Sequence, residues 1–450
     1  MMSLAEAAAV LGASVRGADV RFSGVSTDTR TLRRGELFVA LRGERFDGHG
    51  FLQNAAAAKA AAAVVDSKHI GDLPLPAAVV ADTRLALGVL ARHWRARFRP
   101  ALIAVAGSNG KTTVKEMLAS ILRSNAGDEA VLATAGNLNN DIGVPLTLLR
   151  MRQGHRWCAI ELGMNHKGEI AYLADIARPS VALVNNAQRE HLEFMNSVEE
   201  VAAENAAVYD ALSADGVAVV NADDPQAEFF RRRAGARRVI DFGLDARAQV
   251  SASHAVKPLS SELRLRTPQG EAQATLSIPG LHNVRNALAA AAAAHAAGVG
   301  AKTIGEGLTS FRPYTGRLQV KQTRAGATLI DDSYNANPDS VRAAIDVLAS
   351  CPGPRVLVLG DMGEVGAQGA EFHREVGAYA RAKGVASLLA LGDATREAVQ
   401  AFGAGARHFA SVEELVAHVN GNSILVKGSR FMKMERVVAA LTGAQPQGGH

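Results

Sequence analysis

The chain has 450 residues, of which 48% are hydrophobic, 21% charged and 5% aromatic, and its formal net charge is +5. This length predicts two to four domains, and the composition is that of an ordinary globular protein. Because aromatic residues are scarce and no long basic run occurs, we expect no nucleic acid among its partners. The modest positive balance suits small anionic substrates instead.

The two cysteines, Cys158 and Cys351, lie far apart in apolar, strand-like stretches. This spacing argues against a disulfide framework and fits a reducing compartment. The N-terminus has no basic residue before its apolar part, so it predicts a short helix and not a signal peptide. The most apolar run, 287–300, is too short to cross a bilayer. We therefore expect a cytoplasmic protein without stable membrane insertion.

Residues 1–98 are predicted to form a small first α/β unit. Apolar runs predict strands over 38–41 and 62–65, and the alanine run 55–63 between them predicts a helix. Polar loops separate these elements and are more typical of turns than of a binding site when taken alone. Their residues are Ser26, Thr27, Asp28, Arg30, Arg42, Asp47, Gly48 and His49.

Arg99-Pro100 marks a boundary, and a second unit is predicted over 99–312. Its stretch ALIAVAGSNGKTT, residues 101–113, predicts a buried strand, a tight turn and a helix starting near Thr112. Glycines that open the backbone N–H groups, followed by a helix N-terminus, make a cradle for phosphate. Lys111 is expected to reach the β- and γ-phosphates, and the Thr112 hydroxyl to ligate Mg²⁺. The cradle comprises Gly107, Ser108, Asn109, Gly110, Lys111, Thr112 and Thr113.

The glycine spacing in this turn, GxxGKT, is shorter than in the usual nucleotide loop, so a plain strand–helix turn that contains a lysine is the alternative. The following helix is predicted to bury an apolar face with i, i+3, i+4 spacing. That face comprises Val114, Met117, Leu118, Ile121 and Leu122.

Further strands over 157–161, 181–185 and 217–221 alternate with helices over 169–176 and 198–212, which predicts a parallel sheet covered by helices. Glu161 ends the strand expected beside that of the phosphate loop, and His191 follows the next strand. Both can ligate a metal at the carboxyl edge of the sheet. A lone histidine is equally a surface or packing residue.

Two groups of amides have either a structural or a binding interpretation. Thr134, Asn137, Asn139 and Asn140 form an Asx-type turn or grip a polar substrate beside the transferred phosphate. Asn283 and Asn286, on a helix predicted over 282–297, pair with the edge of a base or cap the helix start.

Phe311-Arg312-Pro313 marks a second boundary, and 313–450 are predicted to form a Rossmann-like third unit. Arg317 lies just past this boundary, where a mobile domain can carry it to a phosphate site. Three strands of this unit end in polar loops, at the edge where α/β ligand crevices lie, and together these loops can hold a zwitterion. Their residues are Asp332, Tyr334, Asn335 and Asn337; Asp361 and Glu364; and Lys427, Ser429 and Arg430.

These motifs resemble the Mur ligase family over essentially the whole chain. GSNGKTT at 107–113 and HNVRN at 282–286 resemble the family in general. Five stretches resemble the member that acts on D-Ala-D-Ala: GNLNNDIGVPLTLL at 136–149, ELGMNHKGEI at 161–170, DDSYNANPDS at 331–340, DMGEVG at 361–366 and LVKGSR at 425–430. An Asp-Asn-Pro-Arg loop, expected of the diaminopimelate- or lysine-adding relative, does not occur.

The resemblance implies a three-domain α/β ligase that uses ATP and Mg²⁺ and acts in peptidoglycan synthesis as a cytoplasmic monomer. Its substrates would be UDP-MurNAc-tripeptide and D-Ala-D-Ala. Residues 1–98 would bind the UDP-sugar, residues 99–312 would form a P-loop ATPase domain with a parallel sheet, and residues 313–450 would receive the dipeptide.

The resemblance also implies roles for single residues. Ser26, Thr27, Asp28, Arg30, Arg42 and the loop of Asp47, Gly48 and His49 would face the UDP-sugar, and Asn137, Asn139 and Asn140 the tripeptide end. Lys111, Arg317 and His191 would be catalytic, with Lys111 on the phosphates and Arg317 on the γ-phosphate. Thr112, Glu161 and His191 would serve Mg²⁺. Asn283 and Asn286 would meet adenine, and Asp332 would help to hold the nucleotide.

One position departs from the family pattern. Many relatives carry a carbamylated lysine where this chain has Asn205, so carbamylation is not expected, and Glu204 or a water is left to assist the metal. Two other functions stay open: a folylpolyglutamate-synthase-like ligase, and a nucleotide-gated binding protein that uses the same loop.

Overall fold

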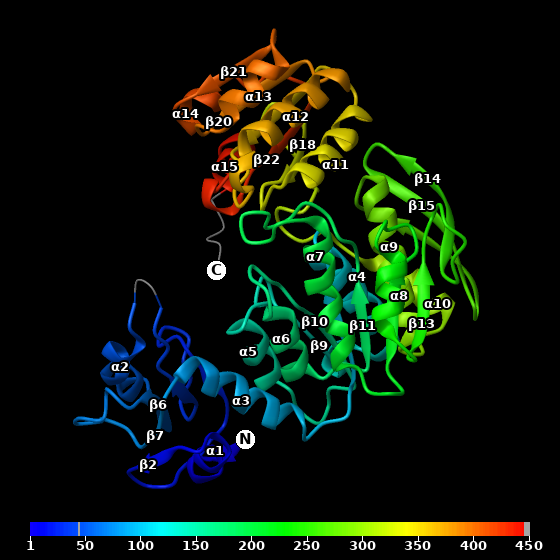
Figure 1. The fold of residues 1–450 in the computed structure, drawn as a ribbon. Coiled ribbons are helices and arrows are strands. Elements are labelled where there is room, and N and C mark those ends of the chain that lie inside the picture. The colour runs from blue at the N-terminus through cyan, green and yellow to red at the C-terminus, as the bar shows by residue number, and fades with distance from the viewer. Residues whose placement is uncertain (44–45, 445–450) are drawn as a thin grey trace.

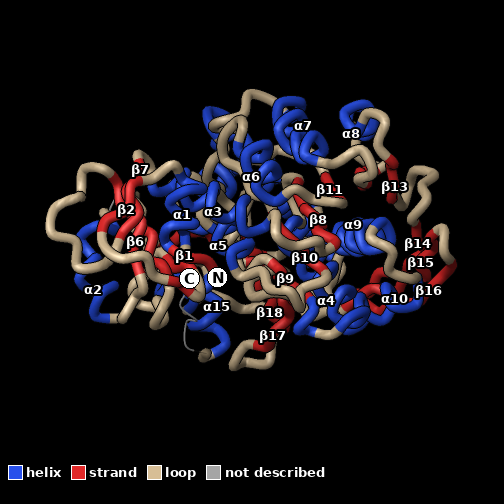
Figure 2. Tube along the Cα trace, turned by 90° about the horizontal axis from the view of Figure 1, so that it is seen from below, coloured by secondary structure: helices blue, strands red, loops and turns tan. Residues whose placement is uncertain are grey.

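The computed structural model describes residues 1–43 and 46–444, and three α/β units follow one another along the chain (Figure 1). Each is built on a mainly parallel sheet. The N-terminal sheet and the small sheet β14–β16 lie at opposite ends of the molecule (Figure 2). No helix in the described part of the chain is long and apolar enough to span a membrane.

The N-terminal unit has a five-stranded sheet of order β2-β7-β6-β5-β4, in which β4, β5, β6 and β7 run parallel. The strands β1 and β3 pair separately. The elements are β1 (Met2–Ser3), α1 (Leu4–Leu11), β2 (Ser14–Arg16), β3 (Arg21–Phe22), β4 (Val25–Ser26), β5 (Leu37–Val39), the 3-10 helix Gly48–Phe51, α2 (Leu52–Ala57), β6 (Ala62–Asp66), β7 (Ala77–Val80) and α3 (Thr83–Arg95).

The central unit has a fully parallel six-stranded sheet of order β13-β12-β11-β8-β10-β9. Its elements are β8 (Ala101–Ala106), α4 (Lys111–Ala126), the 3-10 helix Asp128–Ala130, β9 (Val131–Ala133), α5 (Gly143–Leu149), β10 (Trp157–Glu161), α6 (Glu169–Ala177), β11 (Val181–Val184), α7 (Val198–Ala206), the 3-10 helix Ala207–Ala211, β12 (Val217–Asn221), α8 (Ala227–Ala234), β13 (Arg238–Phe242), β14 (Ser251–Lys257), β15 (Ser260–Thr267), β16 (Gly270–Leu276), α9 (Leu281–Ala296) and α10 (Ala301–Ser310).

The C-terminal unit has a six-stranded sheet of order β17-β18-β22-β19-β20-β21, in which only β17 is antiparallel. Its elements are β17 (Gln319–Gln322), β18 (Thr328–Asp332), α11 (Pro338–Ala349), β19 (Arg355–Gly360), the 3-10 helix Gly366–Gln368, α12 (Gly369–Ala382), β20 (Ser387–Leu391), α13 (Thr395–Phe402), β21 (Ala406–Phe409), α14 (Val412–Val416), β22 (Ser423–Lys427), the 3-10 helix Arg430–Met432 and α15 (Glu435–Thr442).

Strand β8 occupies the middle of the central sheet, with β10 on one side and β11 on the other. The loops after all three strands therefore meet at one carboxyl edge, where open α/β sheets bind ligands. The predicted apolar face of α4 is confirmed, because Val114, Met117, Leu118, Ile121 and Leu122 are fully buried. The three-domain α/β fold class is confirmed as well.

Two predicted helices need correction, and one sheet was missed. The helix predicted over 55–63 ends at Ala57, because Lys59 turns with a φ of +61° and Ala62 already enters strand β6. The helix predicted over 198–212 ends at Ala206 and continues as a 3-10 helix. The antiparallel sheet β14-β15-β16 was not predicted, although β15 alternates between buried and exposed residues.

Candidate nucleotide and substrate site

The turn between β8 and α4 has the geometry of an anion cradle. Gly107 and Gly110 adopt φ values of +127° and +82°, which glycine tolerates and other residues rarely adopt. A Cβ on Gly107 would lie 2.9 Å from the Asn185 nitrogen, and one on Gly110 would overlap Asn286 Oδ1. Helix α4 begins at Lys111, so its first N–H groups are available to an anion at the end of the turn.

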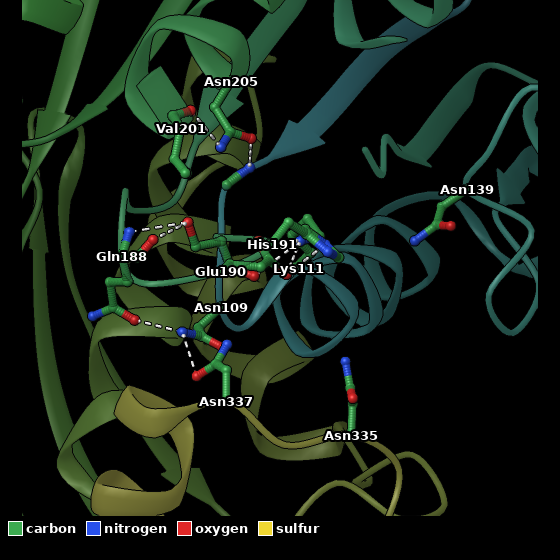
Figure 3. Close-up of polar contacts among 12 residues, drawn as sticks. Asn109, Lys111, Asn139, Gln188, Glu190, His191, Val201, Asn205, Asn335 and Asn337 are labelled. Carbon is green, nitrogen blue, oxygen red and sulfur yellow. Dashed lines mark hydrogen bonds and ion pairs between the residues drawn. The ribbon is translucent and has the colours of Figure 1, made fainter. Parts of the chain in front are cut away.

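Asparagine side chains hold the backbone of the β8–α4 turn in place (Figure 3). The Gly107 N–H donates to Asn205 Oδ1 at 2.7 Å. The Asn109 N–H donates to Asn186 Oδ1 at 2.8 Å. Asn205 also donates from Nδ2 to the Val201 carbonyl at 3.0 Å. Asn205 therefore anchors the turn to α7.

A cleft of about 530 Å³ opens between this turn and the C-terminal unit. It brings together most residues that the sequence predicted for phosphate, metal and substrate. Those in its wall are Ser108, Asn109, Gly110, Lys111, Thr112, Asn137, Asn139, Asn140, Glu161, His191, Arg317, Tyr334, Asn335, Asn337, Glu364, Lys427 and Arg430.

A second cavity of about 530 Å³ adjoins the first on the other side of the turn. The two cavities share residues of the turn, of the linker after α10 and of strand β22. Predicted residues in the second wall are Asn109, Gly110, Thr113, Asn283, Asn286, Arg317, Asp332 and Lys427. The pair of cavities thus forms one long site with the turn at its middle.

Glu161, at the end of β10, has the environment of a metal ligand. It is buried, and its Oε1 lies 3.2 Å from the Thr112 hydroxyl and accepts a 2.7 Å bond from Asn139 Nδ2. Its other oxygen, Oε2, is buried without any hydrogen-bond partner in the described structure. An unpaired buried carboxylate oxygen beside a hydroxyl fits a hard cation such as Mg²⁺.

His191 lies in the loop between β11 and α7, opposite Glu364 of the C-terminal unit. His191 Nδ1 is 2.7 Å from Glu364 Oε2, and this contact with the ring lowers the pKa of Glu364. Both residues have left-handed backbones, with φ values of +52° and +59°. Such strain in residues other than glycine concentrates at functional sites.

The positive charge of Lys111 is balanced by a carboxylate of the protein itself. Its Nζ donates to Glu190 Oε1 at 3.0 Å and to the Ser108 carbonyl at 2.9 Å (Figure 3). Arg317 reaches the same turn from the linker: its Nη2 donates to Thr112 Oγ1 at 3.4 Å, and its guanidinium lies 4.1 Å from the centre of the Tyr334 ring. Its Nε is buried and has no hydrogen-bond partner among residues 1–43 and 46–444.

The amides of the second cavity bond to one another. Asn286 Nδ2 donates to Asn283 Oδ1, and Asn185 Nδ2 donates to Asn286 Oδ1, both at 3.0 Å. Asn283 Nδ2 donates to the Pro279 carbonyl at 2.7 Å, which secures the start of α9. Burial lowers the pKa of the neighbouring His282 to about 4, so its ring is neutral near pH 7.

Lys427 is less available than the sequence indicated. It is buried, and its Nζ donates to Asp332 Oδ2 at 2.5 Å and to the Asn335 carbonyl at 2.9 Å. Burial lowers the pKa of Lys427, and the Asp332 carboxylate opposes that shift. Lys427 and Asp332, both predicted as ligands, thus form an ion pair with each other, and Lys427 lines both cavities.

Thr134, Asp361 and Ser429 lie behind the cleft and not in its wall, so their predicted direct contact with substrate needs correction. Thr134 Oγ1 accepts the Glu161 N–H, and Asp361 accepts the Thr395 N–H at the start of α13. Ser429 Oγ donates to the Ala336 carbonyl and accepts the Gly363 N–H. All three hold neighbouring strands and loops in place.

Glu204 cannot take over the role left open by Asn205. Its carboxylate accepts the N–H groups of Gly168 and Ile170, both at 2.8 Å, and so caps α6. The side chain is committed to that helix start.

The predicted residues of the N-terminal unit form a separate group, away from the turn (Figure 1). The parallel strands β4, β5 and β6 end at the same sheet edge, and the predicted residues follow β4 in 26–30 and β5 in 40–43 and 46–49. Arg42 pairs with Asp47 at 3.3 Å and with Asp66 at 3.1 Å, and His49 Nδ1 contacts Asp47 at 2.5 Å. Ser26, Thr27, Asp28 and Arg30 lie in or beside the first loop, and Gly48 in the second.

Two functional candidates were missed in the sequence, Glu190 and its neighbour Arg189. Arg189 donates to Asp339 at 2.6 Å and to Glu375 at 2.7 Å, both in the C-terminal unit. The Arg189 bonds lower the pKa of Glu375 to about 2. Nothing local in the sequence indicates these contacts, because the partners lie 150 residues or more further along the chain.

Family models match three consecutive stretches of the chain. The matches are to the "Mur ligase family, catalytic domain" over residues 21–95, the "Mur ligase middle domain" over 105–294 and the "Mur ligase, glutamate ligase domain" over 316–430. The chain therefore belongs to the Mur ligase family, as its motifs predicted.

Within this family the chain is similar to one kind of enzyme. It is 42% identical over 449 residues to the UDP-N-acetylmuramoyl-tripeptide–D-alanyl-D-alanine ligase of Escherichia coli, covering 98% of both chains. It is 34% identical to the Bacillus subtilis protein of the same name, covering 93% of each. A crystal structure of MurF from Acinetobacter baumannii matches with a TM-score of 0.90, at 35% identity and 98% coverage of both chains. MurF from Thermotoga maritima, in complex with ADP, matches with a TM-score of 0.81, at 25% identity and 94% and 97% coverage.

Proposed function

We propose that this protein is an ATP-dependent amide ligase that joins D-Ala-D-Ala to UDP-MurNAc-tripeptide and releases ADP and phosphate. The observation that carries the proposal is the long site at the turn, whose wall holds Lys111, Arg317 and Glu161, with Glu161 Oε2 unpaired among the described residues. The whole-length similarity to ligases of that name, one of them solved with ADP, supports it.

Each unit has a proposed task. Residues 1–98 bind the UDP-sugar at the carboxyl edge of β4, β5 and β6, through Arg42, Asp47 and His49 and the loop that starts at Ser26. Residues 99–312 bind ATP, with adenine beside Asn283 and Asn286 in the second cavity. Residues 313–450 receive the dipeptide, with Tyr334, Asn335 and Arg430 in the wall of the first cavity.

The chemistry follows from the weakness of a carboxylate as an electrophile. The terminal carboxylate of the tripeptide attacks the γ-phosphate and forms an acyl phosphate, and the neutral amine of D-Ala-D-Ala then displaces phosphate. Lys111 and Arg317 neutralise the charge that develops on the transferring group. Thr112, Glu161 and His191 would hold Mg²⁺, which supplies further positive charge to the phosphate oxygens.

Other residues orient the reactants. Asn137, Asn139 and Asn140 line the cleft beside Glu161 and are placed to hold the tripeptide end. Closure of the C-terminal unit over the turn would exclude water from the acyl phosphate. We propose that the protein works as a monomer, and in the cytoplasm, where ATP is present.

The test is phosphate release with each substrate omitted in turn. We expect release to require ATP, a divalent cation, UDP-MurNAc-tripeptide and D-Ala-D-Ala together. Release at the full rate without the dipeptide would contradict the proposal and favour a nucleotide-gated binding protein. Activity with glutamate and a folate in place of the peptides would favour the folylpolyglutamate alternative, for which the solved synthases, at 16% identity, support a shared fold alone.

A further inference from the structure

Glu190 has no part in the mechanism above, yet it lies in the wall of the phosphate cleft. Its two carboxylate oxygens are 3.0 and 3.2 Å from Lys111 Nζ, and both side chains are only 11% exposed. A phosphate chain that binds Lys111 meets this carboxylate as a competing anion at close range. In a partly buried site such repulsion is only weakly screened, so Glu190 must leave Lys111 or gain another cation.

A second destination for the Glu190 carboxylate lies next to it in the chain. Glu190 Oε1 is 3.5 Å from His191 Nε2, a separation that two ligands of one metal ion can span. The other ring nitrogen, Nδ1, faces Glu364 Oε2 at 2.7 Å. Among the described residues Nδ1 makes no hydrogen bond despite this close approach, and Nε2 is the ring nitrogen on the side of Glu190, where a shared cation would lie.

We propose that Glu190 is a counter-ion that changes partners. Without nucleotide it pairs with Lys111, and when phosphates occupy Lys111 it joins His191 Nε2 as a ligand of the divalent cation. This inference rests on the proposed function, because it concerns the nucleotide of that reaction. Its consequence is selectivity: nucleotide without metal competes with Glu190, whereas nucleotide that arrives with metal gives Glu190 a new partner.

The test compares the full-length chain with Glu190→Gln, which keeps the shape of the side chain and removes its charge. ADP binding is measured by calorimetry in EDTA, and Mn²⁺ binding to the ADP-saturated protein is measured by electron paramagnetic resonance. We expect metal-free ADP to bind roughly fivefold more tightly to the variant, because the competing anion is gone. We expect Mn²⁺ to bind roughly tenfold more weakly, because a ligand is lost.

Glu193→Gln is the matched control. Glu193 belongs to the same loop, is exposed, and its carboxylate has no ion pair or hydrogen bond among the contacts of the described residues. We expect this variant to match the wild type in both measurements. If its Mn²⁺ affinity equals that of the wild type, removing a carboxylate from this loop does not by itself weaken metal binding.

The opposite signs of the two shifts are the signature of the proposal. Unchanged Mn²⁺ affinity in Glu190→Gln would overturn it, and so would weaker binding of both ADP and Mn²⁺, which indicates a damaged site. If the wild-type chain itself binds no ADP with or without Mn²⁺, the proposed function fails. If the wild type binds ADP and the variant behaves like it, only the role of Glu190 fails.

Discussion

The central unit is attached to its two neighbours in different ways. On the N-terminal side, α3 packs along α5 and α6, and its Leu87, Leu90 and Trp94 belong to one apolar cluster with those helices. Gly88 leaves room there for the Tyr172 hydroxyl, and Trp94 Nε1 donates to the Met151 carbonyl at 3.0 Å. We call this contact the α3 joint.

On the C-terminal side, the cleft is bridged by polar side chains from loops. Arg189 holds Asp339 and Glu375, His191 faces Glu364, and the amides of Asn109 and Asn337 bond at 2.9 Å. The loop that carries Arg189 and His191 reaches toward the C-terminal unit in Figure 1. We call this contact the Arg189 joint, although apolar residues of the two units also meet away from the cleft.

The difference teaches which joint can move. Apolar packing is lost when two surfaces separate, whereas ion pairs can exchange their partners for water at little net cost. A ligase that must admit three substrates and then exclude water needs one joint of the second kind. The comparison therefore assigns stability to the α3 joint and the catalytic cycle to the Arg189 joint.

The largest effect is expected at the cleft itself, for Lys111→Ala. Removal of this cation should lower kcat roughly 10³-fold, because a buried donor to developing charge is lost. Its thermal midpoint should fall by a few degrees, since the mutation leaves the partly buried Glu190 carboxylate without its partner. Steady-state kinetics and calorimetry test this, and residual activity within tenfold of the wild type would place the chemistry elsewhere.

At the α3 joint, Trp94→Ala should cost about 3–5 kcal/mol of stability, the usual result of deleting a large buried ring. The KM for ATP should not change at temperatures where the variant is folded. Trp94→Phe is the matched control, which keeps the ring packing and loses chiefly the bond to Met151, for about 1 kcal/mol. Chemical denaturation measures both, and a large rise in the KM for ATP with Trp94→Ala would contradict the assignment.

At the other joint, Arg189→Met should lower kcat/KM roughly tenfold and cost only about 1 kcal/mol of stability, because the partner carboxylates are partly exposed to water. Small-angle scattering of the nucleotide-bound protein should show a larger radius of gyration. Arg374→Met removes an ion pair to Glu397 within the C-terminal unit and serves as the control. Equal kcat/KM values for Arg189→Met and Arg374→Met would show that Arg189 takes no part in domain closure.

The smallest effect expected is on pH dependence. Bonding to Arg189 holds the pKa of Glu375 at about 2, below its ordinary value of 4.5. A lowered carboxyl pKa stabilises the folded state fully above the ordinary value, and this contribution fades as the pH falls toward 2. The stability difference between the wild type and Arg189→Met should be constant from pH 8 to 5 and shrink below about 4.5. Growth of the difference on acidification would have the wrong sign.

Much of the fold and of the candidate site could be predicted from the local sequence. The glycines at 107 and 110, Lys111 and Thr112 form one contiguous motif, and Glu161 is identifiable because it ends an apolar strand. The α4 face follows from helical periodicity. Sheet β14–β16 carried a readable alternation, with Leu263 and Leu265 inward between Glu262, Arg264 and Arg266. The end of α2 carried no such signal, because alanine favours a helix over the whole run 55–63 and only the pairing of β6 in the sheet overrides that propensity.

Arg189 and Glu190 were missed in the sequence for the same physical reason. Arg189 and Glu190 acquire meaning only from partners brought close by the fold, Asp339 and Glu375 for one and Lys111 for the other. Lys427 appears free in the sequence, and only the pairing of β18 with β22 brings it to Asp332. Polar contacts between distant loops leave no periodic signal in either stretch, whereas strands and helices do.

The most direct measurement of the central claim follows an oxygen atom through the reaction. UDP-MurNAc-tripeptide labelled with ¹⁸O in its terminal carboxylate is incubated with the protein, ATP, Mg²⁺ and D-Ala-D-Ala, and the released phosphate is analysed by mass spectrometry. An acyl phosphate formed at the turn predicts one ¹⁸O in each phosphate released and one amide bond formed per phosphate. Phosphate that carries no label would contradict the account.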